Sequence, residues 1–81
     1  MDKNEITGTV IWLDIKDSPA WKEPYIYVKK DEVYAVILKD EKKYGGDRFK
    51  IFEELDGKRV RATGNFDLKY RVGSVEDVYA V

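Results

Sequence analysis

Aromatic and basic side chains gather in two short parts of this sequence. The first part extends from Trp21 to Tyr34 and the second from Lys69 to Arg71. Aromatic rings stack on nucleobases, which contributes roughly 1–3 kcal/mol per base, and lysine and arginine attract phosphates. These residue types together predict weak binding of single-stranded nucleic acid with little sequence preference. The residues that we expect to bind it are Trp21, Lys22, Tyr25, Tyr27, Lys29, Tyr34, Lys69, Tyr70 and Arg71.

A third group of cations, Lys58, Arg59 and Arg61, lies in the stretch LDGKRVRATGNF. The arginines alternate with Val60 and Ala62, which is the pattern of a strand with one buried face. Acidic side chains on neighbouring strands can pair with such arginines across a sheet. We therefore expect this group mainly to face solvent and to offer at best a secondary contact to nucleic acid. The formal net charge of −1 also argues against a strong, non-specific polyanion binder.

Catalytic chemistry has little support in the sequence. The chain contains no Cys and no His, which removes most zinc sites and every Ser-His-Asp triad. It also lacks motifs such as GxxxxGKS/T, GxSxG and HExxH. Glu53 and Glu54 are adjacent carboxylates, but in so highly charged a chain such pairs are usually solvated acids. We expect a protein that is not an enzyme and needs neither a metal nor a cofactor.

The composition is typical of one small soluble domain spanning residues 1–81. Apolar residues make up 43% of the chain and charged residues 38%. No apolar run approaches the roughly 18 residues that cross a bilayer. The stretch MDKNEITG lacks the apolar core of a secretory signal, so we expect a cytoplasmic location. Gln and Cys are absent while Lys, Glu and Asp abound, which favours a thermophilic source because ion-pair networks cost less at high temperature.

Alternating apolar residues predict strands in the first half of the chain. Residues 5–15 form a long strand whose internal glycine indicates a bulge or bend, and residues 16–24, with two prolines, form a loop. Residues 25–30 and 33–39 form a hairpin around Asp31-Glu32, in which we expect Ile26 to face Ile37. The expected inward side chains are Ile26, Val28, Val33, Ala35 and Ile37, and the outward ones are Tyr25, Tyr27, Tyr34, Val36 and Leu38.

The second half of the chain begins with a helical period. Phe49, Phe52 and Leu55 recur every three residues, which predicts a helix of two to three turns with one apolar face. Asp47 is suited to the N-cap and Gly57 to the left-handed stop. The last two strands are predicted at residues 58–66 and 72–81 around a turn at 67–71, with Val75, Val78 and Val81 inward.

Five strands with one short helix between the third and fourth are the layout of the OB-fold, an all-β Greek-key barrel. The stretches ITGTV, FEELDGKRVRATGNF and VGSVEDVYAV resemble small prokaryotic OB-fold domains. In those domains a Leu-x-Gly-Lys-x-Val-x-x-x-Gly element leads from the helix into the fourth strand. The alternative is an SH3-like barrel, in which the single helical turn usually lies before the last strand.

The resemblance implies where a ligand would bind. In OB-folds, single-stranded nucleic acid lies on the second and third strands and on the loops that join strands one to two and four to five. These are the parts of the chain that hold the aromatic and basic residues above. The same aromatic face is equally suited to another protein or to a second copy of the chain, because Tyr, Trp and Leu are common in both kinds of interface. No membrane partner is expected.

Overall fold

The structure, a computed structural model, describes residues 3–15 and 18–81. The chain is mostly β-strand with one small α-helix, which confirms the prediction from the alternating apolar residues. The helical segment lies between the third and fourth strands, as expected. In chain order the elements are β1 (Asn4–Ile15), β2 (Ser18–Lys29), β3 (Glu32–Leu38), the 3-10 helix η1 (Glu41–Tyr44), α1 (Lys50–Glu54), β4 (Arg59–Asp67) and β5 (Val72–Ala80).

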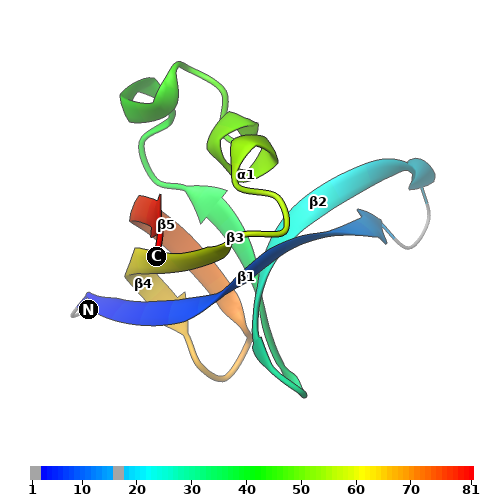
Figure 1. The fold of residues 1–81 in the computed structure, drawn as a ribbon, viewed down its shortest axis with the longest axis vertical. Helices are drawn as coiled ribbons and strands as arrows, with labels where there is room; N and C mark the ends of the chain where they lie inside the picture. Colours follow the sequence, from blue (N-terminus) through cyan, green and yellow to red (C-terminus); the bar gives the residue numbers. More distant parts are fainter. Residues whose placement is uncertain (1–2, 16–17) are drawn as a thin grey trace.

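The five strands form one sheet that closes on itself into a ring (Figure 1). The order around the ring is β1-β2-β3-β5-β4, and β4 pairs back to β1. Neighbouring strands are antiparallel except for β3 and β5, which run parallel. Figure 1 shows both helices beyond one end of the ring and the hairpin of β1 and β2 projecting to one side.

A glycine allows the long first strand to pair with two neighbouring strands. Residues 4–9 of β1 pair with β4, whereas residues 9–15 pair with β2. Near this change of partner, a Cβ atom on Gly8 would lie only 2.4 Å from the backbone oxygen of Tyr27. Gly8 therefore permits a close approach of two backbones. The irregularity in the β1–β2 register lies farther along, between Asp14 and Ile15, and its extra residues are on β2 rather than on β1.

The interior of the ring is filled by apolar side chains from all five strands and the helical segment. They are Ile6, Val10, Ile26, Tyr34, Val36, Leu38, Phe52, Leu55, Val60, Ala62, Phe66, Val75 and Val78. The alternation predicted for β4 is confirmed, because every second residue of that strand is buried. An irregularity in the β4–β5 register lets Val75 and Val78 both point inward. The prediction for Val81 is wrong, because this residue follows β5 and is 56% exposed.

The loop expected at residues 16–24 is largely strand. β2 begins at Ser18 and pairs with the end of β1, where Pro24 lies opposite Trp12. The ladder from β2 to β3 ends at the residue after Pro24, so β3 does not require an N–H from the proline. A proline is tolerated at such a strand edge. The prolines, from which we predicted a loop, are therefore compatible with a strand. Residues 16 and 17 lie outside the described part of the chain.

The hairpin of β2 and β3 turns at a different place from the one expected. Its two-residue turn is Lys30-Asp31, with Asp31 at a φ of 67°, and β2 carries a bulge just before it. Ile26 consequently faces Tyr34 rather than Ile37. The register is shifted by three residues, and a shift by an odd number exchanges the two faces of β3. The observed register buries the larger side chains of that strand. Those inside the ring are Tyr34, Val36 and Leu38, and those outside are Val33, Ala35 and Ile37, which reverses the predicted arrangement of β3.

The helix between β3 and β4 is shorter than predicted. Asp47 accepts a hydrogen bond from the backbone N–H of Phe49 at 2.8 Å, but α1 begins only after Phe49 and has five residues. Phe52 and Leu55 are buried, as their spacing predicts. Gly57 has a φ of 76°, which confirms the expected left-handed residue after the helix.

Candidate functional site

The outside of the ring carries a continuous apolar surface over β1, β2, β3 and β5. Tyr25 lies opposite both Ile11 and Ala35, and Ala35 in turn lies opposite Val72. Four of its side chains are between 41% and 48% exposed, and the largest apolar patch on a small protein is often an interaction site. We call this surface the outer face. Its side chains are Ile11, Leu13, Tyr25, Tyr27, Val33, Ala35, Ile37 and Val72.

Aromatic rings lie on the outer face and at its margins. Tyr27 is 41% exposed on the face itself, and Tyr25 beside it is half-buried. Trp21, which is 68% exposed, lies farther along β2, just beyond Lys22, where the regular β1–β2 register ends. Tyr70, in the turn that leads into β5, is 69% exposed. Four of the five expected aromatic residues are therefore accessible to a ligand.

Tyr34 is the fifth of these residues, and its expected place on the outer face is wrong. The shifted register buries its side chain completely, with its ring edge-to-face against Phe66 at a centroid distance of 5.8 Å. Its hydroxyl donates to the Glu32 carboxylate at 2.9 Å and accepts from the Arg71 guanidinium at 3.0 Å. Burial raises the pKa of this hydroxyl, and the hydrogen bond to Glu32 raises it further. Tyr34 is therefore a core residue and not a platform for a base.

Two of the expected cations lie apart from each other. Lys22 is on the opposite side of β2 from Tyr25, in a shallow pocket that also contains Glu53 and Asp56. Those two carboxylates reduce its attraction for a phosphate. Lys69 is exposed in the turn between β4 and β5, and its ammonium lies 5.4 Å from the centre of the Tyr70 ring. Lys69 is thus better placed than Lys22 to contact a ligand on the outer face.

The other two expected cations share one carboxylate. Arg71 lies 3.5 Å from Glu32, and Lys29 lies 3.8 Å from the same side chain. Through the Tyr34 hydroxyl, this group joins the turn between β2 and β3 to the turn between β4 and β5. Both cations are partly neutralised, so the outer face has little free positive charge to offer a phosphate.

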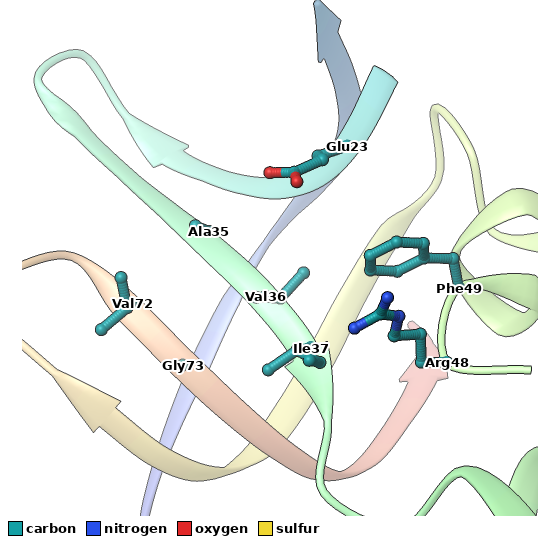
Figure 2. Close-up of a pocket in the computed structure, with 8 residues that line it drawn as sticks. All are labelled: Glu23, Ala35, Val36, Ile37, Arg48, Phe49, Val72 and Gly73. Carbon is teal, nitrogen blue, oxygen red and sulfur yellow. The ribbon is translucent and has the colours of Figure 1, made fainter. Parts of the chain in front are cut away.

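A pocket of about 260 Å³ opens where the outer face approaches the helical segment (Figure 2). We call it the β3 pocket, because β3 forms its floor with Ile37 near the centre. Glu23 of β2 lies on one side of it, and Arg48 and Phe49 lie on the other. The pocket thus combines an apolar floor with a carboxylate and a guanidinium that approach from different elements.

A second pocket, of about 340 Å³, lies where the outer face passes onto β4. We call it the β4–β5 pocket. It shares Ile37 and Val72 with the β3 pocket. Asn65 on β4 lies directly opposite Ser74 on β5, and Ser74 lies opposite Ile37 on β3. The Oδ1 atom of Asn65 is buried without a hydrogen-bond partner among the residues that the structure describes.

The basic group Lys58, Arg59 and Arg61 borders the outer face rather than belonging to it. Arg59 lies opposite Thr9 of β1, which in turn lies opposite Tyr27. It is on and just before β4, which β1 and β5 separate from β2 and β3. The Arg61 Nε atom is 3.6 Å from Oε1 of Glu5 on β1, which is the kind of cross-strand pair that the sequence predicts. All three basic side chains are exposed, so this group mainly faces solvent.

Ion pairs cluster around Glu76 on β5. Lys3 lies 2.6 Å and Lys39 2.9 Å from the carboxylate oxygens of Glu76. Hydrogen bonds from Lys3 and then from Lys39 lower the pKa of Glu76 to about 2. The neighbouring Asp77 hydrogen-bonds to Lys43, which raises the pKa of that lysine. These carboxylates are already paired, so we assign the cluster to stability.

Sequence reasoning missed Glu23, Arg48, Asn65 and Ser74. Asn65 continues the alternation of Arg59 and Arg61 along β4 and so belongs to its outward side, but polar residues at such positions usually only face water. For Glu23 and Arg48 no sequence signal exists, because closure of the ring brings their elements together. Within the described ranges, no group of acidic side chains is placed to hold a metal ion. No described helix is long and apolar enough to cross a membrane.

Comparison with known proteins adds no further information on function. The chain matches no protein-family model, no curated protein and no solved structure. A functional assignment must therefore come from the geometry of the outer face and its two pockets.

Proposed function

We propose that this protein is a non-catalytic module that binds single-stranded nucleic acid weakly on its outer face. The observation that carries the proposal is the pair of accessible rings, Tyr25 and Tyr27, on one side of β2, with the exposed Trp21 farther along the same strand. Bases of any sequence stack on such rings. Tyr70 and Lys69 at the other margin supply one more ring and a cation. Because Lys29 and Arg71 are already paired with Glu32, we expect most of the affinity to come from stacking.

We further propose that the ring of strands is an OB-fold, which would support this function. That fold is a Greek-key barrel of five strands and binds oligonucleotides on strands two and three. A helical segment between β3 and β4, a long β1 shared by two neighbours and a parallel β3–β5 pair that completes the ring all agree with it. An SH3-like barrel would place its helical turn before the last strand, where this chain has the turn at residues 68–71.

Quenching of tryptophan fluorescence by oligo(dT) at low salt tests the proposal. The two tryptophans differ, because the half-buried Trp12 donates its indole N–H to the backbone oxygen of Phe52 at 3.2 Å while Trp21 is 68% exposed. We expect quenching that survives Trp12→Phe and disappears in Trp21→Phe. Absence of quenching at high micromolar oligonucleotide contradicts the proposal.

A pair of tyrosine variants locates the binding surface. Tyr27→Ser should weaken oligonucleotide binding about five-fold or more, the lower end of the range for one stacked base. Tyr79→Ser is the matched control. Tyr79 is similarly exposed, at 49%, but lies on β5 opposite Arg61, away from the outer face. We expect the control to bind as the wild type does, and an equal loss in both variants argues against the outer face.

A second candidate function is favoured by the aliphatic middle of the outer face. Val33, Ala35, Ile37 and Val72 offer no rings for stacking, and an apolar face of this kind also suits a protein partner or a second copy of the chain. Sedimentation at high concentration tests the second-copy form. Self-association that Ile37→Lys abolishes supports it, whereas a monomer at all concentrations removes it.

A further inference from the structure

The β4–β5 pocket contains polar side chains that base stacking does not require. Its apolar side is formed by Ile37 and Val72, which are 41% and 48% exposed. Its polar side is formed by Asn65, Ser74 and Asp67. An apolar surface wide enough for a planar ring therefore lies directly beside an amide, a hydroxyl and a carboxylate.

The amide of Asn65 has an unused acceptor. Its Oδ1 atom forms no hydrogen bond with the described residues although it is buried, and buried acceptors normally have a donor. Asn4 is different, because its Oδ1 accepts from the backbone N–H of Phe66 at 2.9 Å and its Nδ2 donates to the Phe66 oxygen at 3.1 Å. The Asn65 side chain as a whole is only partly buried, and a contact with a ligand requires it to rotate so that its amide reaches the pocket.

The carboxylate of Asp67 determines which part of a nucleic acid suits this pocket. Its Oδ1 atom accepts from the backbone N–H groups of Lys69 at 2.8 Å and of Tyr70 at 2.9 Å. The negative charge is therefore held in place at the pocket, where it repels a phosphate and attracts an N–H donor. Once the Asn65 side chain rotates, its Oδ1 atom and the Asp67 carboxylate would be two acceptors for the edge of a base.

Building on the proposed function, we infer that the β4–β5 pocket is a subsite for one nucleobase and favours a base with an exocyclic amino group. The ring of the base lies on Ile37 and Val72, and its amino group donates to Asn65, a contact that asparagine makes with base edges elsewhere. The subsite is continuous with the stacking surface, because Ala35 lies opposite both Tyr25 and Val72. Adenine, cytosine and guanine satisfy this requirement, whereas thymine and uracil do not.

The side-chain amide signals in a ¹⁵N–¹H spectrum test this inference directly. The chain has asparagine only at positions 4 and 65 and has no glutamine, so these signals come from two residues. During titration with oligo(dC) at low salt, we expect the Asn65 amide to shift together with the backbone amides of Tyr25 and Tyr27. The Asn4 amide, held on Phe66, should not move. Oligo(dC) should bind about five-fold more tightly than oligo(dT), the lower end of what one well-placed base contact discriminates.

The variant Asn65→Leu should bind oligo(dC) only as tightly as oligo(dT), while Tyr25 and Tyr27 still respond. If oligo(dC) shifts these tyrosines in the wild type but not the Asn65 amide, or binds no more tightly than oligo(dT), the subsite is refuted and the proposed function stands. If neither oligonucleotide shifts any of these signals, both are refuted. The wild-type spectra decide between these outcomes even if Asn65→Leu does not fold.

Discussion

Arg71 is held in an uncommon backbone conformation by contacts with Tyr34 and Glu32. Its φ is 58°, in the left-handed region that non-glycine residues rarely adopt. Its guanidinium bonds to the Tyr34 hydroxyl, pairs with Glu32 and lies 5.4 Å from the centre of the Tyr34 ring. At the scale of single residues, Arg71 therefore acts on the turn before β5, which carries Tyr70, more than on a ligand.

Removing one oxygen atom tests the interior position of Tyr34. Tyr34→Phe keeps the ring against Phe66 but deletes both hydrogen bonds of the hydroxyl. We expect a loss of about 1–3 kcal/mol in the free energy of unfolding, measured by urea denaturation. Oligonucleotide binding should stay close to that of the wild type. A loss of binding as large as that of Tyr27→Ser would show that Tyr34 belongs to the binding surface.

At the scale of elements, the shape of β1 depends on the missing side chain of Gly8. The added methyl group in Gly8→Ala would clash with the Tyr27 backbone where β1 changes partner from β4 to β2. We expect a loss of about 1–3 kcal/mol in unfolding free energy, typical of overpacking. Thr7→Ala, at the adjacent position, is the control and should cost clearly less. An unaffected Gly8→Ala protein would contradict the close crossing.

Some elements can be predicted from the sequence because their burial pattern has one solution. β4 alternates small or apolar residues with polar ones, so only one face can be buried. β3 is apolar on both faces, since Val33, Ala35 and Ile37 alternate with Tyr34, Val36 and Leu38. Periodicity then cannot say which face points inward. The turn at Lys30-Asp31 and the bulge in β2 decide it, and neither has a strong local signal.

The same limit applies to the candidate site. Trp21, Tyr25, Tyr27 and Tyr70 could be found from sequence because exposed aromatic residues on strands and turns are informative by type alone. The two pockets could not, since each depends on which strands become neighbours when the ring closes. Asn65 and Ile37, for example, line the same pocket because β5 pairs with both of their strands and lies between them.

At the scale of the whole molecule, the ion pairs of Glu76 make stability depend on acid pH. The pKa of Glu76 is about 2 in the folded protein, below its ordinary value of 4.5. The unfolded chain therefore takes up the proton first as the pH falls. The stabilisation is complete above about pH 5 and is lost as the pH falls toward about 2. Glu76→Gln should be less stable at pH 7 and should lose less stability on acidification, measured by urea unfolding at several pH values.

The control for this prediction is Glu5→Gln, which removes a more exposed carboxylate with one ion pair, to Arg61. We expect a smaller change in stability at pH 7 and nearly the acid dependence of the wild type. Identical acid dependence in Glu76→Gln and the wild type would contradict the assigned role of the cluster.

Thermal unfolding tests the thermophilic source that the composition favours. Abundant Lys, Glu and Asp, the absence of Gln and Cys, and the ion-paired carboxylates Glu76 and Asp77 on β5 lead us to expect a midpoint of thermal unfolding above about 60 °C, near the upper limit for mesophilic domains. Calorimetry or circular dichroism measures it, and a lower midpoint would contradict a thermophilic source.

The central claim is that the outer face binds single-stranded nucleic acid. A backbone chemical-shift titration with a mixed oligonucleotide pool at low salt tests it most directly, because one experiment detects binding and maps it. We predict shifts at Trp21, Tyr25, Tyr27 and Ala35 and none at Tyr79, which is exposed on β5 opposite Arg61. No shifts, or shifts that centre on β4 and β5 near Tyr79, would contradict the claim.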